Sequence, residues 1–211
     1  DNVYLIGTVN MDETTHPFSK KVLDRANTIE FNYINLNQFP DHGADEDVGF
    51  VTVHHQFLRS DYLQLVHAYE QYEDLIKATT EKLVEVNRIL ESIHAHVGFR
   101  IRDAVCFYMI YNDRFQLMSE DEAFDLQLLQ KILPRIQGSH LAVKKVLLQL
   151  LQFCLNENFS MNDMLDDASE LYSRWDVGET PPDAKYPRSA RKLAFMLRRY
   201  DEDGFTSYWL S

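Results

Sequence analysis

A helical repeat of apolar residues extends over most of this chain. In residues 80–92 the apolar side chains recur three or four positions apart, which places them on one face of a helix. Similar repeats predict five further helices, so an all-helical region is expected at residues 59–211. The predicted helices cover residues 80–92, 100–111, 120–136, 140–157, 162–174 and 188–200.

The predicted helix at residues 140–157 is apolar around much of its circumference. A helix that is apolar on most sides is usually buried, so we expect it at the centre of the helical region. A helix that contacts a second subunit is the alternative. Cys106 and Cys154 both lie in apolar helical patterns, and we expect them to be reduced thiols in the core rather than a disulfide.

Two local signals predict where the helix at residues 120–136 begins and ends. Ser119 is followed three positions later by Glu122, which is the pattern of a capping box at a helix start. Pro134 lies near the other end of this helix. It should terminate or kink the helix, because proline lacks the backbone N–H that a helix needs.

Residues 1–31 follow a different pattern. Val3 to Val9 is an apolar run of strand length, as is typical of strands that are buried on both faces of a parallel sheet. Asn10 then lies at the carboxyl end of this strand, where open α/β sheets bind their ligands. A short helix that opens at Pro17 and a second strand at residues 28–31 complete the unit.

A connecting loop is expected between the two regions. Residues 32–60 contain a proline, two glycines and an acidic stretch at residues 41–47, with a possible short strand at residues 51–55. The predicted domains are therefore part of an α/β core with its linker at residues 1–58 and a helical domain at residues 59–211. The predicted fold class is mainly α, with a small α/β remnant at the N-terminus.

The first unit resembles the second half of the nucleotide-binding core of AAA+ nucleoside triphosphatases. It is most similar to the B subunit of the McrBC methylation-dependent restriction system, in which a GT-x-N strand end is followed by an acidic residue, a leucine and arginine, and an aromatic-ending strand. Asp24 before Arg25 is closer to the version in MoxR-like proteins. The matching residues are Gly7, Thr8, Val9, Asn10, Glu13, Leu23, Arg25 and Phe31.

This resemblance implies three catalytic residues in the intact protein. Asn10, at the sensor-1 position, and Glu13 would orient the attacking water. Arg25 would be an arginine finger, which acts on the transferring phosphoryl group of the neighbouring subunit in a ring. The simpler alternative is that Arg25 interacts with the helix dipole or with Asp24.

The helical region then corresponds to the AAA+ lid, which should contribute a further arginine, sensor 2, to the nucleotide. Gly98-Phe99-Arg100 precedes a helix rich in aromatic residues, and Arg100 matches the McrB-like motif position best. Arg102 is the second candidate. The alternative for both is a surface ion pair with a nearby aspartate such as Asp103.

Two later stretches, residues 125–136 and 186–209, also resemble McrB-like ATPases. Arg188 is a third candidate for sensor 2, because a Pro-Arg pair opens a helix there as in MoxR-like proteins. Arg135 and Arg188 could contact a nucleotide or a neighbouring subunit. An arginine near a proline-broken helix end more often binds backbone carbonyls, and we favour that interpretation.

The sequence contains no G-x-x-x-x-G-K-[ST] phosphate loop and no apolar strand that ends in paired acids for Mg²⁺. The resemblance places both upstream of Asp1, in the half of the core that binds the Mg²⁺–nucleoside triphosphate. The chain alone is therefore expected to be an inactive fragment of a GTP or ATP hydrolase. Its histidines lack the spacing of a metal site, so no metal ligands are predicted.

The formal net charge of −12 argues against direct DNA binding by this segment, because nucleic-acid binding depends on clustered Lys and Arg. No apolar run reaches membrane-spanning length, and a cytoplasmic location is expected. The resemblance implies a ring-forming homo-oligomer with a nuclease partner subunit. A MoxR-like chaperone and a non-enzymatic helical interaction domain are the alternatives.

Overall fold

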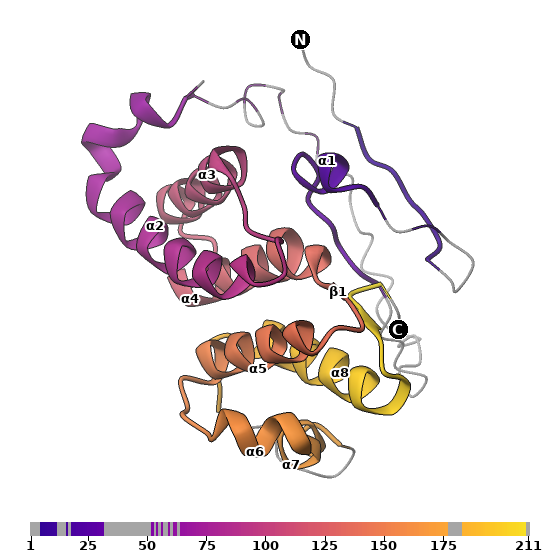
Figure 1. Cartoon of the computed structure of the whole chain (residues 1–211). Coiled ribbons are helices and arrows are strands. Elements are labelled where there is room, and N and C mark those ends of the chain that lie inside the picture. The colour runs from indigo at the N-terminus through magenta and orange to yellow at the C-terminus, as the bar shows by residue number, and fades with distance from the viewer. Residues whose placement is uncertain are drawn as a thin grey trace, which may run out of the picture.

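The computed structural model of this chain is mainly helical, which confirms the coarse fold class (Figure 1). Its only strands among the described residues are two short ones, one before α5 and one after α8. The structure describes residues 5–11, 16, 18–31, 52, 54, 56, 59, 61–62, 64–176 and 183–209. We call residues 64–176 and 183–209 the helical body, and residues 18–31 the docking segment.

The described elements are α-helices, three shorter helical turns and two short strands. Single turns of 3-10 helix occur at Leu65–His67 and Leu133–Arg135, and a π-helical turn occurs at Leu128–Ile132. The remaining elements are α1 Lys20–Leu23, α2 Tyr69–Glu91, α3 Phe99–Phe115, α4 Glu120–Gln127, β1 Gln137–Gly138, α5 Leu141–Leu155, α6 Met161–Asp166, α7 Ser169–Ser173, α8 Pro187–Asp203 and β2 Thr206–Ser207.

The helical body has two groups of helices. Helices α2, α3 and α4 pack together in one group, and α5 packs along α8 in the other, with α6 and α7 beside them (Figure 1). Contacts of α5 with α2 and of α4 with α8 join the two groups. β1 and β2 pair antiparallel, with Gln137 opposite Ser207 and Gly138 opposite Thr206. Because β1 precedes α5 and β2 follows α8, this pairing places the C-terminal end of α8 near the start of α5.

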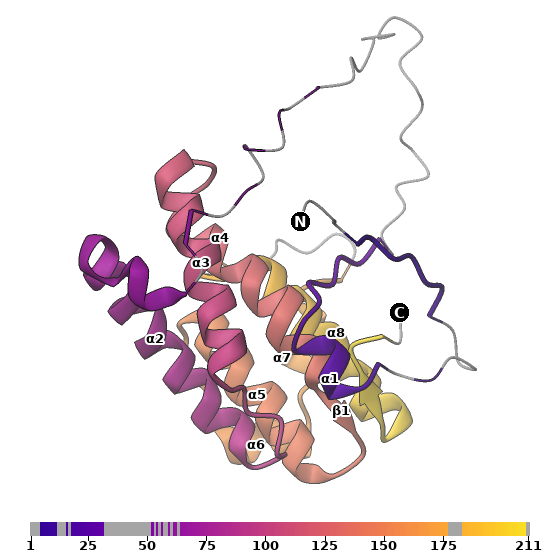
Figure 2. The same ribbon diagram turned by 90° about the horizontal axis from the view of Figure 1, so that it is seen from above.

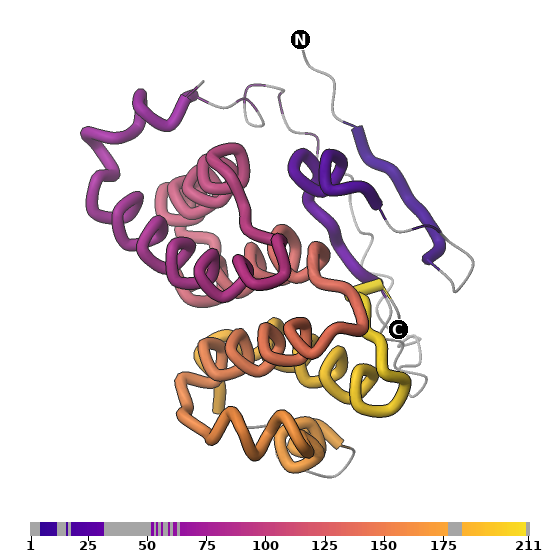
Figure 3. Tube along the Cα trace, in the orientation of Figure 1, coloured from indigo at the N-terminus to yellow at the C-terminus, as the bar shows by residue number. Residues whose placement is uncertain are grey.

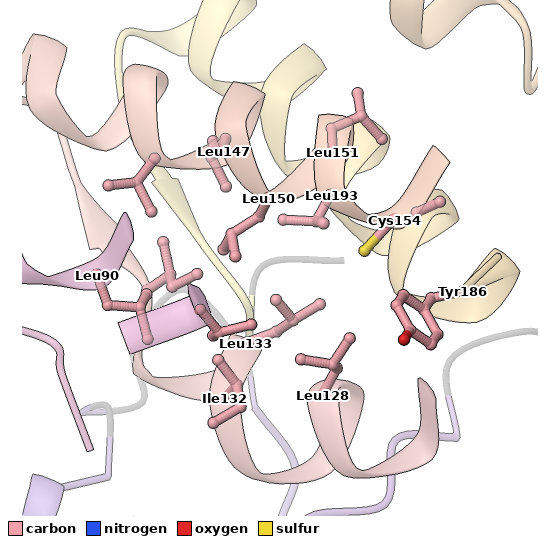
Figure 4. Packing of buried hydrophobic residues seen from close by; sticks show 14 of the residues in the cluster. Leu90, Leu128, Ile132, Leu133, Leu147, Leu150, Leu151, Cys154, Tyr186 and Leu193 are labelled. Carbon is pink, nitrogen blue, oxygen red and sulfur yellow. The ribbon is translucent and has the colours of Figure 1, made fainter. Parts of the chain in front are cut away.

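Helix α5 lies at the centre of the core, as its apolar circumference predicts. The side chains of Leu147, Leu150 and Leu151 are buried, and Leu150 points toward Leu90 of α2 and Leu133 (Figure 4). Cys106 and Cys154 are both buried free thiols, as expected. Burial of Cys154 raises its pKa well above the ordinary value, so this thiol stays protonated and unreactive.

The local signals around α4 are also confirmed. Ser119 caps the helix, accepting from the backbone N–H of Glu122, while the Glu122 carboxylate accepts from the backbone N–H of Ser119 at 3.0 Å. The α-helix ends at Gln127, seven residues before Pro134, and continues as the π-helical and 3-10 turns. The predicted helix at residues 120–136 is thus one element with an irregular second half.

Two predicted helices differ from the structure. The helix expected at residues 162–174 is two short helices, because Asp167 is extended (φ −146°) and its carboxylate accepts from the backbone N–H of Ser169 at 2.8 Å. The helix expected to begin near residue 80 instead begins at Tyr69. It contains a kink at Tyr72 (φ −125°, ψ 30°) that interrupts the earlier part of the helix.

The two strands predicted in residues 1–31 are not formed. Residues 5–9, the described part of the first, and residues 28–31 have no strand structure, since neither stretch pairs with another strand among the described residues. Between them, α1 is a single turn. Figure 2 shows the docking segment on the side of the helical body opposite the start of α2, and Figure 3 traces it from α1 toward β2.

Candidate functional site

Arg25 follows the last turn of α1 and is exposed. Its Nη1 donates a hydrogen bond to the carbonyl of Lys21 at 2.8 Å, one turn back in the same helix. The guanidinium therefore lies along the C-terminal end of α1, where a positive charge is favoured by the helix dipole. This contact agrees with the simpler alternative for Arg25.

Asp24, the neighbour of Arg25, is paired with the buried residue Arg135. Nη1 of Arg135 lies 2.5 Å from Oδ1 of Asp24, and the Arg135 side chain is only 5% exposed. Nε and Nη2 of the same guanidinium donate to the carbonyls of Ala95 at 3.2 Å and His96 at 3.3 Å. Arg135 thus binds carbonyls of the loop before α3 rather than those of its own helix end, and joins the docking segment to that loop.

Ala26, on the other side of Arg25, is held by the π-helical turn. Nζ of Lys131 donates to the carbonyl of Ala26 at 2.9 Å, and the backbone N–H and Oγ1 of Thr28 both donate to the carbonyl of Gln130, at 3.4 and 2.7 Å. Burial lowers the pKa of Lys131, and the carboxylate of Asp24 opposes that shift. A π-helical turn leaves carbonyls such as that of Gln130 available to partners outside the helix.

Further contacts fix both ends of the docking segment. The ring of Phe18 packs edge-on against Trp209 with the centroids 5.3 Å apart, and Nζ of Lys192 pairs with Oε1 of Glu30 at 2.6 Å. The Lys192 ammonium also lies over the ring of Tyr208, 4.5 Å from its centroid. Burial lowers the pKa of Lys192, while Glu30 opposes the shift.

The two lid arginines on α3 have different surroundings. Arg100, in the first turn of α3, is exposed. Arg102 donates from Nε and Nη2 to Oδ1 of Asp103, at 2.8 and 2.6 Å, and lies over the ring of Phe99 at 4.8 Å. Arg102 therefore has the surface ion pair that was the alternative to a nucleotide contact.

Arg188 lies at the start of α8, after Pro187, and its side chain is exposed. The N-terminus of this helix already has an anionic partner. The buried carboxylate of Asp125 accepts from the backbone N–H groups of Arg188 and Ser189, both at 2.8 Å. Asp125 therefore occupies the position that a phosphate would take at a helix N-terminus.

Two predicted residues, Asn10 and Glu13, remain. Asn10 belongs to the exposed stretch of residues 5–10, and Glu13 lies outside the described residues. The structure thus brings together the surroundings of Arg25 and the loop that leads to Arg100, with Arg135 between them. In the part of the chain that the structure describes, no three His, Cys, Asp or Glu side chains form a metal-binding group, and no helix is long and apolar enough to cross a membrane.

Comparison with known families assigns the helical part of this chain. The sequence model of a family described as a domain of unknown function, DUF8727, matches residues 46–205. The chain belongs to this family. No curated protein and no solved structure matches the chain. The matched region contains the whole of α2 to α8 and begins after Asn10, Glu13 and Arg25.

The pairing of Asp24 with Arg135 was not predicted from the sequence, although both residues were noted separately. Asp24 was notable as an acidic residue where McrB-like proteins carry an arginine, and Arg135 as an arginine beside a proline. The signal that could have linked them is a carboxylate at position 24, where an arginine is usual, together with Arg135 in an otherwise apolar stretch. Their separation of 111 positions hides that signal from any local pattern.

Proposed function

We propose that this chain is the C-terminal portion of an AAA+ nucleoside triphosphatase subunit of the McrB type. In this proposal residues 1–31 belong to the nucleotide-binding core and the helical body is its lid. The observation that carries the proposal is the alternation of burial at the end of the docking segment. Ala26, Thr28 and Glu30 are partly buried against the helical body, whereas Asn27, Ile29 and Phe31 are exposed.

This period of two is that of a strand with two different faces. One face contacts the helical body, and the other carries Asn27 with Ile29 and Phe31, the last two 67% and 88% exposed. In the stretch before α1, Leu5 and Ile6 are each 94% exposed. Covering a large apolar side chain is worth about 1.5–3 kcal/mol, so these residues favour a further partner.

The partner that fits these two stretches is the remainder of an α/β core. Residues 5–9 form a continuous apolar run, as expected of a strand that has neighbours on both sides and helices on both faces. The G-x-x-x-x-G-K-[ST] phosphate loop, which this sequence lacks, belongs to that same remainder. We infer that the strands at residues 3–9 and 28–31 form when the sheet of the phosphate-loop half lies beside them.

The proposed roles follow from the positions of the side chains. Asn10 and Glu13 orient the attacking water, and Arg25 acts on the neighbouring subunit's nucleotide. Arg100 is the favoured lid contact, because Arg102 is paired with Asp103 and the helix end at Arg188 is occupied by Asp125. Mg²⁺ and the triphosphate are bound mostly by the phosphate-loop half.

In a McrB-type system the nucleotide cycle drives DNA restriction together with a nuclease partner subunit, and the subunits form a homo-oligomeric ring in the cytoplasm. The net charge of −12 supports DNA contact through another segment. A MoxR-like chaperone shares the same ring and the Asp-Arg pair at residues 24–25. The preferred nucleotide separates the two, because use of GTP favours the McrB group.

A helical interaction domain is the second candidate function. The observation that favours it is the extent of the family match, which covers residues 46–205 and excludes the catalytic motifs. The helical body also has its own apolar core, with α5 at its centre. In that case the helical body would be the binding domain, and the docking segment would only pack against its surface.

Hydrolysis by the protein extended upstream to include the phosphate loop decides between these functions. We expect GTP or ATP hydrolysis by the wild type and a loss of about 10³-fold in Arg25→Ala, the size expected for an arginine finger. Arg88→Ala, which removes an exposed arginine from α2, is the matched control and should retain the wild-type rate. Absent hydrolysis, or equal rates in the two variants, would favour the interaction domain.

A further inference from the structure

Arg25 is fixed on both sides by one short stretch of the helical body. Asp24 pairs with Arg135 at 2.5 Å, and the carbonyl of Ala26 accepts from Lys131 at 2.9 Å. Both cationic residues are buried and lie only four positions apart, at the π-helical turn and the 3-10 turn after it. The backbone on either side of Arg25 is thus held, while its own side chain stays exposed.

The same buried guanidinium also holds the entrance to α3. Arg135 donates to the carbonyls of Ala95 and His96, and Nζ of Lys20 donates to the carbonyl of His94 at 2.8 Å. These three consecutive residues precede Gly98, the N-cap of α3, and Arg100 follows in its first turn. A displacement of the loop before α3 therefore also displaces the Arg135 guanidinium, which pairs with Asp24.

Arg135 is suited to transmit such a displacement. The guanidinium is a rigid planar fork whose donors have fixed directions. With its side chain 5% exposed, it cannot leave one partner without leaving a buried charge less well compensated. The loop at residues 94–96, the turn at residues 133–135 and the end of α1 are therefore expected to move together.

We propose that Arg135 is a positioning residue that couples the lid contact at Arg100 to the arginine finger at Arg25 of the same subunit. This inference rests on the proposed AAA+ function. Arg100 reports on the nucleotide of its own subunit, whereas Arg25 acts in the site of the next. The nucleotide state of one subunit thus sets the hydrolysis rate of its neighbour, through a chain of contacts that passes through Arg135 and Asp24.

Asp24→Asn in the extended protein is the first test, since Asp24 is one-third exposed and the substitution leaves the buried Arg135 side chain itself in place. We expect kcat to fall at least 10-fold, with KM for the nucleotide changed by less than 3-fold, because the finger acts on the transferring phosphoryl group. Asp24→Glu keeps a carboxylate on a longer side chain and should recover part of the rate.

The matched control is Asp201→Asn, which removes the acidic partner of another buried cation. Lys144 pairs with Asp201 at 2.6 Å, and the two side chains are 5% and 18% exposed. This variant should lower thermal stability while kcat stays within 2-fold of wild type. Equal losses of kcat in Asp24→Asn and Asp201→Asn would mean that Asp24 is only structural, and would overturn the inference.

Mixing subunits is the second test, because Arg25 acts in trans and Asn10 in cis. We would mix subunits that carry Asn10→Ala with subunits that carry Asp24→Asn. Some interfaces in the mixture then combine Asn10 of an Asp24→Asn subunit with Asp24 of an Asn10→Ala subunit, so both residues are intact there. If Asp24 works through Arg25, the mixture regains activity as a mixture of Asn10→Ala with Arg25→Ala does. If Asp24 serves only its own subunit's site, the mixture with Asp24→Asn stays inactive and the inference is wrong.

The two proposals fail in different ways. Loss of hydrolysis in Arg25→Ala together with a wild-type rate in Asp24→Asn would overturn the coupling and leave the AAA+ function in place. No hydrolysis by the wild type, or a wild-type rate in Arg25→Ala, would overturn the AAA+ function and the coupling with it.

Discussion

The helical body and the docking segment are held by opposite kinds of contact. In the body, α5 is surrounded by apolar side chains of α2, the π-helical turn and α8. The docking segment is instead attached mainly by hydrogen bonds and ion pairs from two buried cations, Lys131 and Arg135, and from the partly buried Lys192, while Ile29 and Phe31 are exposed.

The difference shows which of the two regions has an apolar core of its own. Apolar burial is the main favourable term in folding, and the helical body has that term within its own helices. At residues 26–31 the docking segment contacts the body through Ala26, Thr28 and Glu30, and it has Ile29 and Phe31 exposed. A segment built in this way is stabilised further by any partner that covers its apolar face.

The sharpest test of this comparison replaces one large apolar residue in each region. Leu151→Ala leaves a cavity in the core and should lower the free energy of unfolding by about 2–5 kcal/mol. Ile29→Ala removes a side chain that is 67% exposed and should change it by less than about 0.5 kcal/mol. Urea unfolding followed by circular dichroism measures both, and equal effects would mean that the two regions share one core.

Removing one cation should release the docking segment and leave the body folded. Lys131→Met keeps the length of the side chain but loses the bond to the carbonyl of Ala26. We expect amide exchange at Thr28 to accelerate by about 10-fold, the equivalent of about 1.4 kcal/mol, which is the size of one charge-assisted hydrogen bond. Lys145→Met, on the exposed side of α5, is the control. Faster exchange throughout α5 would show that the regions unfold together.

The smallest expected effect concerns a polar atom in the core. The Tyr186 hydroxyl is buried without a hydrogen-bond partner among the described residues, while its ring stacks on Phe153 with the centroids 5.4 Å apart. Tyr186→Phe keeps the ring, so it should change stability at pH 7 by less than about 1 kcal/mol, toward greater stability.

At alkaline pH the same variant should gain an advantage. Burial raises the pKa of Tyr186 above its ordinary value. The unfolded chain therefore loses this proton first, at a pH near about 10, and wild-type stability falls as the pH rises beyond that value. Tyr186→Phe lacks this contribution and should lose less stability between pH 9 and about pH 11. Parallel pH profiles for the two proteins would contradict the assignment.

Most of the helical body could be predicted, because its signals are local. The apolar repeat fixed the positions of α3, α5 and α8 to within a few residues, and the capping box fixed the start of α4. The break before α7 was missed, since the bond from Ser169 to Asp167 outweighs a helical repeat that continues through it. The strands were overpredicted, since strand propensity cannot supply the neighbouring strand that a sheet requires.

The candidate site was harder to predict than the fold. Arg25, Arg100 and Arg102 could be selected by motif, but their surroundings depend on contacts between distant parts of the chain. The partners of Arg135 lie 39 to 111 residues away in sequence. A one-dimensional pattern carries no information about such pairs, so the role of Arg135 could only come from the fold.

The long sequence separations of these contacts also set an order in time. Asp24 precedes Arg135 by 111 residues, and Glu30 precedes Lys192 by 162. At about 5–20 residues per second of synthesis, Glu30 waits about 10–30 s before its partner has been made. The docking segment therefore leaves the ribosome early and docks late, and Ile29 and Phe31 are open throughout that interval to whatever binds nascent apolar chains.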